Sequence, residues 1–92
     1  MASSRFIITV IGSDKVGIVA RITMVMANFN VNIVDITQTI MQGIFTMIML
    51  AEAPQEGFDL QAFQEGMEAE GKNLGVEVKV QHEDIFRFMH RI

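Results

Sequence analysis

Apolar and polar positions alternate along much of the chain with the two-residue period of β-strands. Residues 32–41 and 76–81 alternate in this way, and the second stretch does so without a fault. Residues 6–11 form a short apolar run rich in β-branched residues, which also favours a strand. The pattern therefore predicts strands at these three places.

A fourth strand is predicted over residues 44–50, which are almost continuously apolar. Gln42 and Gly43 precede it as a hairpin turn, because glycine accepts the positive φ that tight hairpins require. A near-continuous apolar run is typical of a central strand with both faces covered. The helices of one small domain cover one face, so we expect something else to cover the other.

Two helices are predicted between these strands, and a shorter one after them. In residues 18–29, the apolar stripe follows helical spacing at Ile18, Ile22, Val25 and Phe29. In the tail, residues 82–92, the apolar positions suit a short amphipathic helix that packs on its own sheet or on a second subunit.

The second long helix has a recognisable beginning. We expect Asp59 to cap it, with Phe58 and Phe63 packing together across its first turn as a hydrophobic staple. Gly71 is its predicted end. Its predicted buried stripe consists of Leu60, Phe63 and Met67.

The order βαββαβ predicts an α+β, ferredoxin-like fold, because crossovers between strands separated by a helix are right-handed. The expected architecture is a four-stranded antiparallel sheet with two helices on one face and a short C-terminal helical tail. Residues 1–92 then form a single domain, with a core of about 5–82 and a tail of 83–92.

Composition excludes several functional classes. The chain is 50% hydrophobic and 20% charged, so part of its apolar surface is expected to be buried against a partner. A net charge of −4 argues against nucleic-acid binding. No apolar run approaches the roughly 20 residues of a membrane-spanning helix. We expect a cytoplasmic protein that contacts no membrane.

The junction between the first strand and the first helix is the candidate for ligand binding. Gly17 lets the chain turn tightly there and leaves the first N–H groups of the helix unobstructed. With the positive end of the helix dipole, such groups favour an anion, for example a carboxylate.

The residues around this junction resemble the ACT domain, a small βαββαβ regulatory module of amino-acid metabolism. The resemblance rests on residues 14–20, on Val31-Asn32-Ile33, and on the stretches 34–39, 43–47 and 82–86. The resemblance extends from Phe6 to about Gln81. The chain resembles the small stand-alone ACT proteins of prokaryotes more than it resembles ACT domains attached to enzymes. These small proteins are similar to the halves of the glycine cleavage repressor.

The resemblance implies an amino-acid site between subunits, formed by the strand-to-helix loop of one domain and the start of the second strand of another. The implied ligand-binding residues are Gly12, Asp14, Lys15, Val16, Gly17, Ile18, Asn32 and Ile33. Many members have proline where this chain has Val16. Asp14 would attract the ammonium of a ligand and repel its carboxylate, so the orientation of the amino acid stays open.

Four of these residues also have a structural interpretation. Gly17 can serve only the turn, Asp14 can cap the helix, Lys15 can be solvated, and Asn32 can satisfy backbone groups in a turn. These alternatives remain open at the level of the sequence.

Catalysis has little support, so we expect no enzyme. No serine is paired with a histidine in a recognisable order, cysteine is absent, and no phosphate-binding loop is present. Neither a metal nor another cofactor is expected, because His82 and His90 have no ligand at a suitable spacing.

Two functions follow from these observations. The first is a homodimeric regulatory module that binds a free amino acid at a subunit interface and modulates a partner enzyme or regulator. The alternative is a ligand-free module for homo-oligomerisation or protein interaction, which rests on the apolar strand 44–50 and the amphipathic tail.

Overall fold

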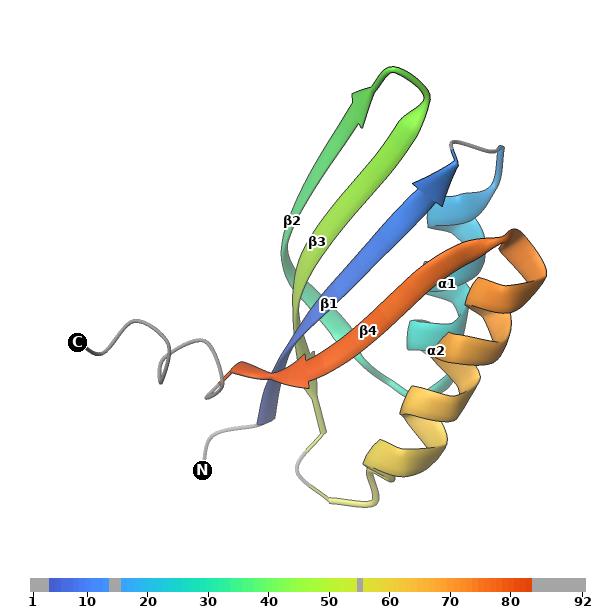
Figure 1. Cartoon of the computed structure of the whole chain (residues 1–92). Helices are drawn as coiled ribbons and strands as arrows, with labels where there is room; N and C mark the ends of the chain where they lie inside the picture. The colour runs from blue at the N-terminus through green and yellow to red at the C-terminus, as the bar shows by residue number, and fades with distance from the viewer. Residues whose placement is uncertain (1–3, 14–15, 55, 84–92) are drawn as a thin grey trace.

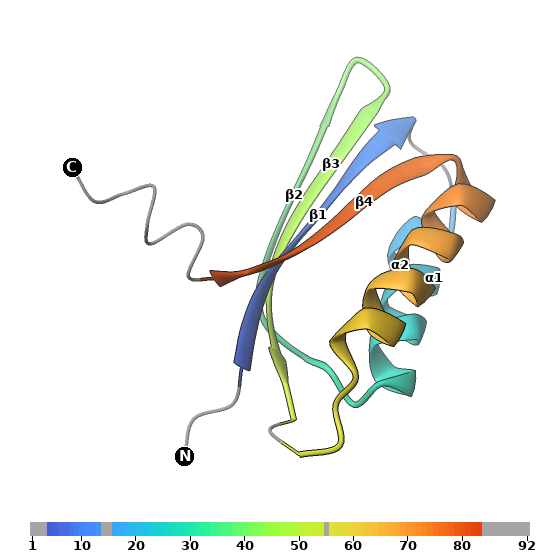
Figure 2. The ribbon, with the colours of Figure 1, turned by 60° about the horizontal axis from the view of Figure 1, so that its bottom comes forward.

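The computed structural model describes residues 4–13, 16–54 and 56–83. Their order is β1 (Ser4–Ser13), α1 (Ile18–Asn28), β2 (Asn32–Met41), β3 (Ile44–Ala53), α2 (Leu60–Leu74) and β4 (Val76–His82). The strands form one antiparallel sheet in the order β2-β3-β1-β4. Both helices lie on one face of it, which confirms the predicted ferredoxin-like fold (Figures 1 and 2).

The core lies between the helices and the inner face of the sheet. Strands β1 and β3 each bury every second side chain there, as the two-residue period requires. Ile22, Met26, Phe63 and Met67 meet them from the helices, and all four are at most 1% exposed. None of the described helices covers the opposite face of the sheet (Figure 2).

The hairpin between β2 and β3 confirms the predicted turn. Gln42 and Gly43 both have positive φ, 52° and 81°. Positive φ at both central residues is the requirement of a type I′ turn, whose twist matches that of the flanking strands.

The beginning of α2 is also as predicted. The Asp59 Oδ1 accepts a hydrogen bond of 3.1 Å from the backbone N–H of Ala62. The rings of Phe58 and Phe63 lie 5.5 Å apart, so the hydrophobic staple is present.

The predicted end of α2 at Gly71 is wrong, because the helix continues to Leu74. A Cβ added at Gly71 would lie 2.8 Å from the Val78 Cγ2, so glycine is there because the helix crosses β4 closely. Gly75 caps the helix instead. Leu60 of the predicted buried stripe is 38% exposed, since it is the first residue of α2.

The predicted tail helix lies outside the described residues except for Glu83. At the end of β4, the His82 ring packs edge-on against Phe6, with ring centroids 5.4 Å apart. The C-terminal end of the described chain is therefore held beside the start of β1.

Candidate ligand-binding site

The turn into α1 has the backbone geometry that the sequence suggests. Gly17 precedes the helix in the left-handed region, with φ 91°, and its carbonyl accepts a 3.0 Å hydrogen bond from the Arg21 N–H. None of the described side chains caps the helix, and its first turn carries no acidic residue. The first N–H groups of α1 lie at the positive end of the helix dipole, which favours an anionic group.

The neighbours of Gly17 contribute to this site in different ways. Ile18 is 2% exposed, so its side chain belongs to the core and only its backbone N–H can face a ligand. Val16 is fully exposed. Asp14 and Lys15 lie outside the described residues.

Gly12 has a clear packing role. It pairs with Val76 across the β1–β4 ladder, and a Cβ added to it would lie 2.6 Å from the Val76 Cγ1. A close approach of β1 and β4 is therefore enough to require glycine here. The ligand contact implied for Gly12 stays a prediction.

Asn32 and Ile33 lie at the opposite end of the sheet from Gly12. Asn32 and Arg5 both pair with Glu52, whereas Gly12 pairs with Phe45. Arg5, which is level with Asn32, lies seven residues along β1 from Gly12. This is a length of about 23 Å at 3.3 Å per residue. One subunit therefore does not bring its Asn32 to its own α1 turn.

The exposed surface of β2 was not predicted from the sequence. Every side chain from Val34 to Met41 is exposed, on both faces of the strand. Val34 sits at an irregularity in the β2–β3 ladder, between Ile33 and Asp35. The available signal was Met41 beside Ile40, since adjacent apolar residues in a strand point to opposite faces.

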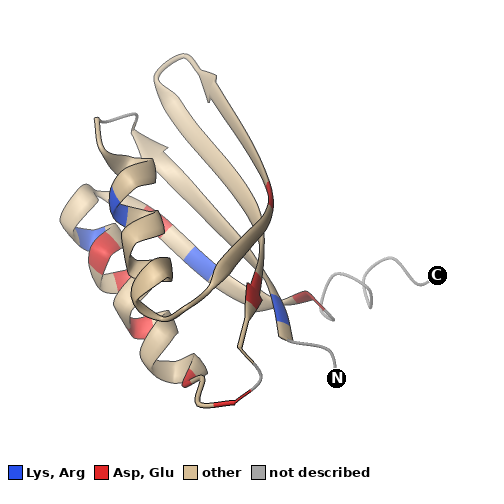
Figure 3. Cartoon of the chain, turned by 180° about the vertical axis from the view of Figure 1, so that it is seen from behind, with Lys and Arg blue, Asp and Glu red and all other residues tan. Residues whose placement is uncertain are grey.

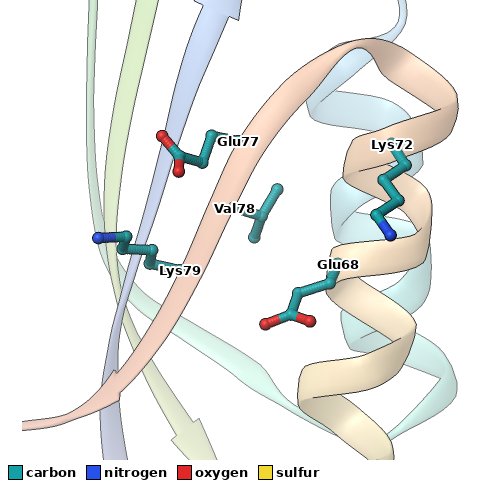
Figure 4. A pocket seen from close by; sticks show the side chains of 5 residues that line it. All are labelled: Glu68, Lys72, Glu77, Val78 and Lys79. Carbon is teal, nitrogen blue, oxygen red and sulfur yellow. The ribbon is translucent and has the colours of Figure 1, made fainter.

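A shallow pocket of about 260 Å³ lies between α2 and β4, away from the predicted residues. Its lining consists of Glu68, Lys72, Glu77, Val78 and Lys79 (Figure 4). Figure 4 shows that Glu77 and Lys79 leave the strand on the side opposite to Val78. Because the charged groups do not converge on one point, the pocket lacks the arrangement that fixes a small ligand.

A second pocket, of about 400 Å³, lies between the two helices. Arg21 and Glu70 line it and approach each other to 3.6 Å. Both charges are thereby engaged with each other. Among the described residues, no three His, Cys, Asp or Glu side chains are placed to hold a metal ion.

The sequence pattern that defines the ACT domain matches residues 4–81. The chain belongs to the ACT domain family. A UPF0237 protein of Methanosarcina acetivorans is 85% identical to it over 92 residues, the whole of both chains. The predicted resemblance is thereby confirmed.

Solved structures show the same ACT fold. An ACT domain protein from Streptococcus pneumoniae superposes with a TM-score of 0.79 at 37% identity, covering 91% of this chain and 94% of that one. A structure described as that of a glycine cleavage system transcriptional repressor has a TM-score of 0.78 at 18% identity. It covers 89% of this chain and 48% of that one, and it shows the fold alone.

ACT domains are generally regulatory, non-catalytic modules that bind small ligands and oligomerise. For this ACT domain, the α1 turn and the start of β2 are the two places where the predicted residues gather. None of the described helices is both long and apolar enough to cross a membrane.

Proposed function

We propose that this chain is a regulatory module that binds a free amino acid between two subunits and thereby modulates a partner protein. The ligand lies between the α1 turn of one subunit and the start of β2 of the other. The observation that carries the proposal is the placement of Gly17 and Asn32 at opposite ends of the sheet. A second copy can bring its Asn32 to the turn, whereas a single chain cannot.

The two edges of the sheet differ in how they are protected. On β4, the Gln64 Nε2 donates a 3.2 Å hydrogen bond to the Val80 carbonyl, and Glu77 and Lys79 add charge. Such features discourage the addition of another strand. Along β2, the only charged side chain is Asp35, and the exposed residues are otherwise apolar or neutral. The β2 edge is therefore the better candidate for contact between subunits.

Antiparallel pairing of two β2 edges about a two-fold axis gives the required geometry. The start of each β2 then lies beside the hairpin end of the other. The hairpin end is also the end at which β1 leads into the α1 turn, since Ser13 pairs with Ile44 (Figure 1). The partner subunit's Asn32 thus approaches the Gly17 turn.

The chemistry of these groups suits an amino acid. The N–H groups at the start of α1 accommodate a carboxylate, and an asparagine amide can both donate and accept hydrogen bonds. The exposed apolar side chains of Val16 and Ile40 lie towards the same end and suit an apolar portion of the ligand.

Isothermal titration with the twenty amino acids tests this function. We expect saturable binding of at least one of them, and Asn32→Ala should weaken it about 10-fold or more, because hydrogen bonds to charged groups contribute roughly 1.5–3 kcal/mol. Gln61→Ala is the matched control, since Gln61 is an exposed amide in the first turn of α2, the helix that packs on β4, at the other end of the molecule from the α1 turn. It should bind like the original protein.

A folded protein that ignores every amino acid would contradict the ligand function. Equal affinities of Asn32→Ala and Gln61→Ala would contradict the position of the site. In the first case the alternative gains support, namely a ligand-free module for oligomerisation or protein interaction. The exposed apolar residues of β2 favour that second function.

A further inference from the structure

The groove between the two helices carries two opposite charges and an apolar wall. It has a volume of about 400 Å³, within the range of pockets that bind small molecules. Its described lining consists of Arg21, Met24, Val25 and Asn28 from α1 and of Glu70 from α2. The α1 residues follow the spacing i, i+3, i+4 and i+7, so they share one side of that helix. One chain therefore forms this groove without a second subunit.

The two helices run in opposite directions beside the groove. A Cβ added at Gly66 of α2 would lie 3.6 Å from the Val25 Cγ1, so the helices are in contact at this level. One turn further along α2, the Glu70 Oε2 lies 3.6 Å from the Arg21 Nη1, which is one turn back along α1. Figure 3 shows the basic band of α1 beside the acidic bands of α2. The beginning of α1 therefore lies beside the end of α2.

Both charged residues lie at the helix end that disfavours them. A helix carries a partial positive charge at its N-terminal end and a partial negative charge at its C-terminal end. Arg21 is in the first turn of α1, and Glu70 is four residues before Leu74, the last residue of α2. Each side chain therefore adds to the charge of its helix end. The groove presents a positive and a negative pole side by side.

The Glu70 carboxylate lacks hydrogen-bond donors in the single chain. Its side chain is only 20% exposed, and its distance of 3.6 Å to Arg21 exceeds the roughly 2.7–2.9 Å of a charge-assisted hydrogen bond. Within residues 4–13, 16–54 and 56–83, no other group donates a hydrogen bond to this carboxylate. A carboxylate with little access to water and no donor favours a ligand that supplies one.

We infer that the groove binds a free α-amino acid as its zwitterion. The ligand ammonium lies beside Glu70 and donates the hydrogen bonds that this carboxylate lacks, while the ligand carboxylate accepts hydrogen bonds from the Arg21 guanidinium. An α-amino acid carries both charges on one carbon atom, which matches two opposite side-chain charges in contact. The ligand opens the Arg21–Glu70 pair at little cost, because Arg21 is 63% exposed and exposed ion pairs are weak.

The rest of the lining selects the side chain of the ligand. Met24 is exposed and Val25 is half-buried, and together they form an apolar wall next to the ion pair. Asn28 lies seven residues from Arg21, a length of about 10 Å along the helix at 1.5 Å per residue. The described lining holds no charge besides the pair. An uncharged, apolar side chain of the length of leucine or methionine therefore fits best.

The groove does not depend on the proposed interface site. That site requires Asn32 of a second subunit, whereas every lining group of the groove belongs to one chain. Gly17 precedes α1, and the groove extends from Arg21 towards the other end of that helix. A single chain therefore contains an amino-acid site of its own.

Methyl NMR of protein labelled at methionine and isoleucine tests the groove. Titration with L-leucine should shift the Met24 methyl signal saturably, with a dissociation constant on the order of 1 mM. The Ile40 methyl signal reports on the proposed interface site in the same spectrum, since Ile40 lies at the hairpin end of β2. The signals of the buried Met47 and Met67 are internal references for the fold.

Removal of either charge should weaken binding in the groove. Arg21→Gln and Glu70→Gln should each raise the dissociation constant about 5-fold, the effect of losing one partly exposed ion pair. Arg5→Gln is the matched control, because Arg5 forms an ion pair with Glu52 at the same distance of 3.6 Å, on the sheet. Arg5→Gln should leave the Met24 response unchanged.

Two leucine derivatives test the same contacts from the side of the ligand. N-acetylleucine lacks the ammonium charge and leucinamide lacks the carboxylate, so each should shift Met24 with a dissociation constant about 5-fold higher than that of leucine. The Arg21→Gln variant should bind leucine and leucinamide equally, because the guanidinium that contacts the carboxylate is then absent.

Two results would overturn the inference. One is a Met24 signal that stays in place at about 50 mM leucine, far above the expected dissociation constant. The other is a shift that N-acetylleucine and the Arg21→Gln variant reproduce in full, since it would show contact with the apolar wall alone. The Ile40 signal separates this inference from the proposed function. A response of Ile40 without Met24 would overturn the groove and support the interface site, and a response of Met24 without Ile40 would do the reverse.

Discussion

At the scale of single residues, Val76 and Val78 mark the place where β1, β4 and α2 approach most closely. A Cβ at Gly12 would lie 2.6 Å from the Val76 Cγ1, and one at Gly71 would lie 2.9 Å from the Val76 carbonyl oxygen. Contacts below 3.0 Å require the neighbouring atoms to move. The backbone oxygen cannot move without disturbing the strand, so these two positions depend on glycine for packing.

The two helical glycines of α2 provide a matched pair. Gly71→Ala should destabilise the protein by about 1–2 kcal/mol, because the cost of overpacking exceeds the gain of about 1 kcal/mol in helix propensity. Gly66→Ala makes the same chemical change with a nearest contact of 3.5 Å, to the Phe29 ring. It should stabilise by about 0.5–1 kcal/mol.

Urea unfolding of the two variants gives the free energies directly. Shifts of the same sign and size would contradict the close packing of α2 on β4. Both glycines occur in a helical pattern, so the sequence alone does not distinguish them. Only Gly71 has the neighbouring strand β4 packed closely against it.

At the scale of elements, the features that could be predicted are those set by neighbours in the chain. The Gln42-Gly43 turn and the Asp59 cap depend on a few consecutive residues, and both are present. The wrong prediction that α2 ends at Gly71 has a different cause. Glycine is required there because Val78, on β4, packs closely against the helix. A local pattern cannot separate a glycine that ends a helix from one that lets a strand approach.

The cap of α2 can be tested by substitution. Asp59→Ala removes the only described side-chain hydrogen bond to the first turn of the helix and should destabilise by about 1 kcal/mol. Gln61→Ala is the control, because Gln61 is exposed in the same turn and should shift stability by less than about 0.5 kcal/mol. Thermal unfolding compares the two, and equal midpoints would contradict the role of the cap.

At the scale of the whole molecule, the candidate site was only partly predictable. The backbone geometry at Gly17 could be expected from its place between a strand and a helix. The separation of Asn32 from that turn by the length of the sheet follows from the topology, and it makes a second subunit necessary for the proposed site. The exposure of β2 on both faces depends on where the helices lie, which no local pattern specifies.

The stability of the protein should therefore depend on its concentration. Ile40 and Met41 of β2 are 59% and 67% exposed in a single chain, and the proposed contact between β2 edges would cover them. When a dimer unfolds to two chains, each tenfold rise in concentration stabilises the folded state by about 1.4 kcal/mol of dimer. We expect the urea midpoint to rise steadily from 1 to 100 μM chain. Ile40→Lys on β2 should reduce that rise, and Met24→Lys, at an exposed apolar residue on α1, should preserve it. A midpoint independent of concentration in the original protein would show that a single chain is the folding unit.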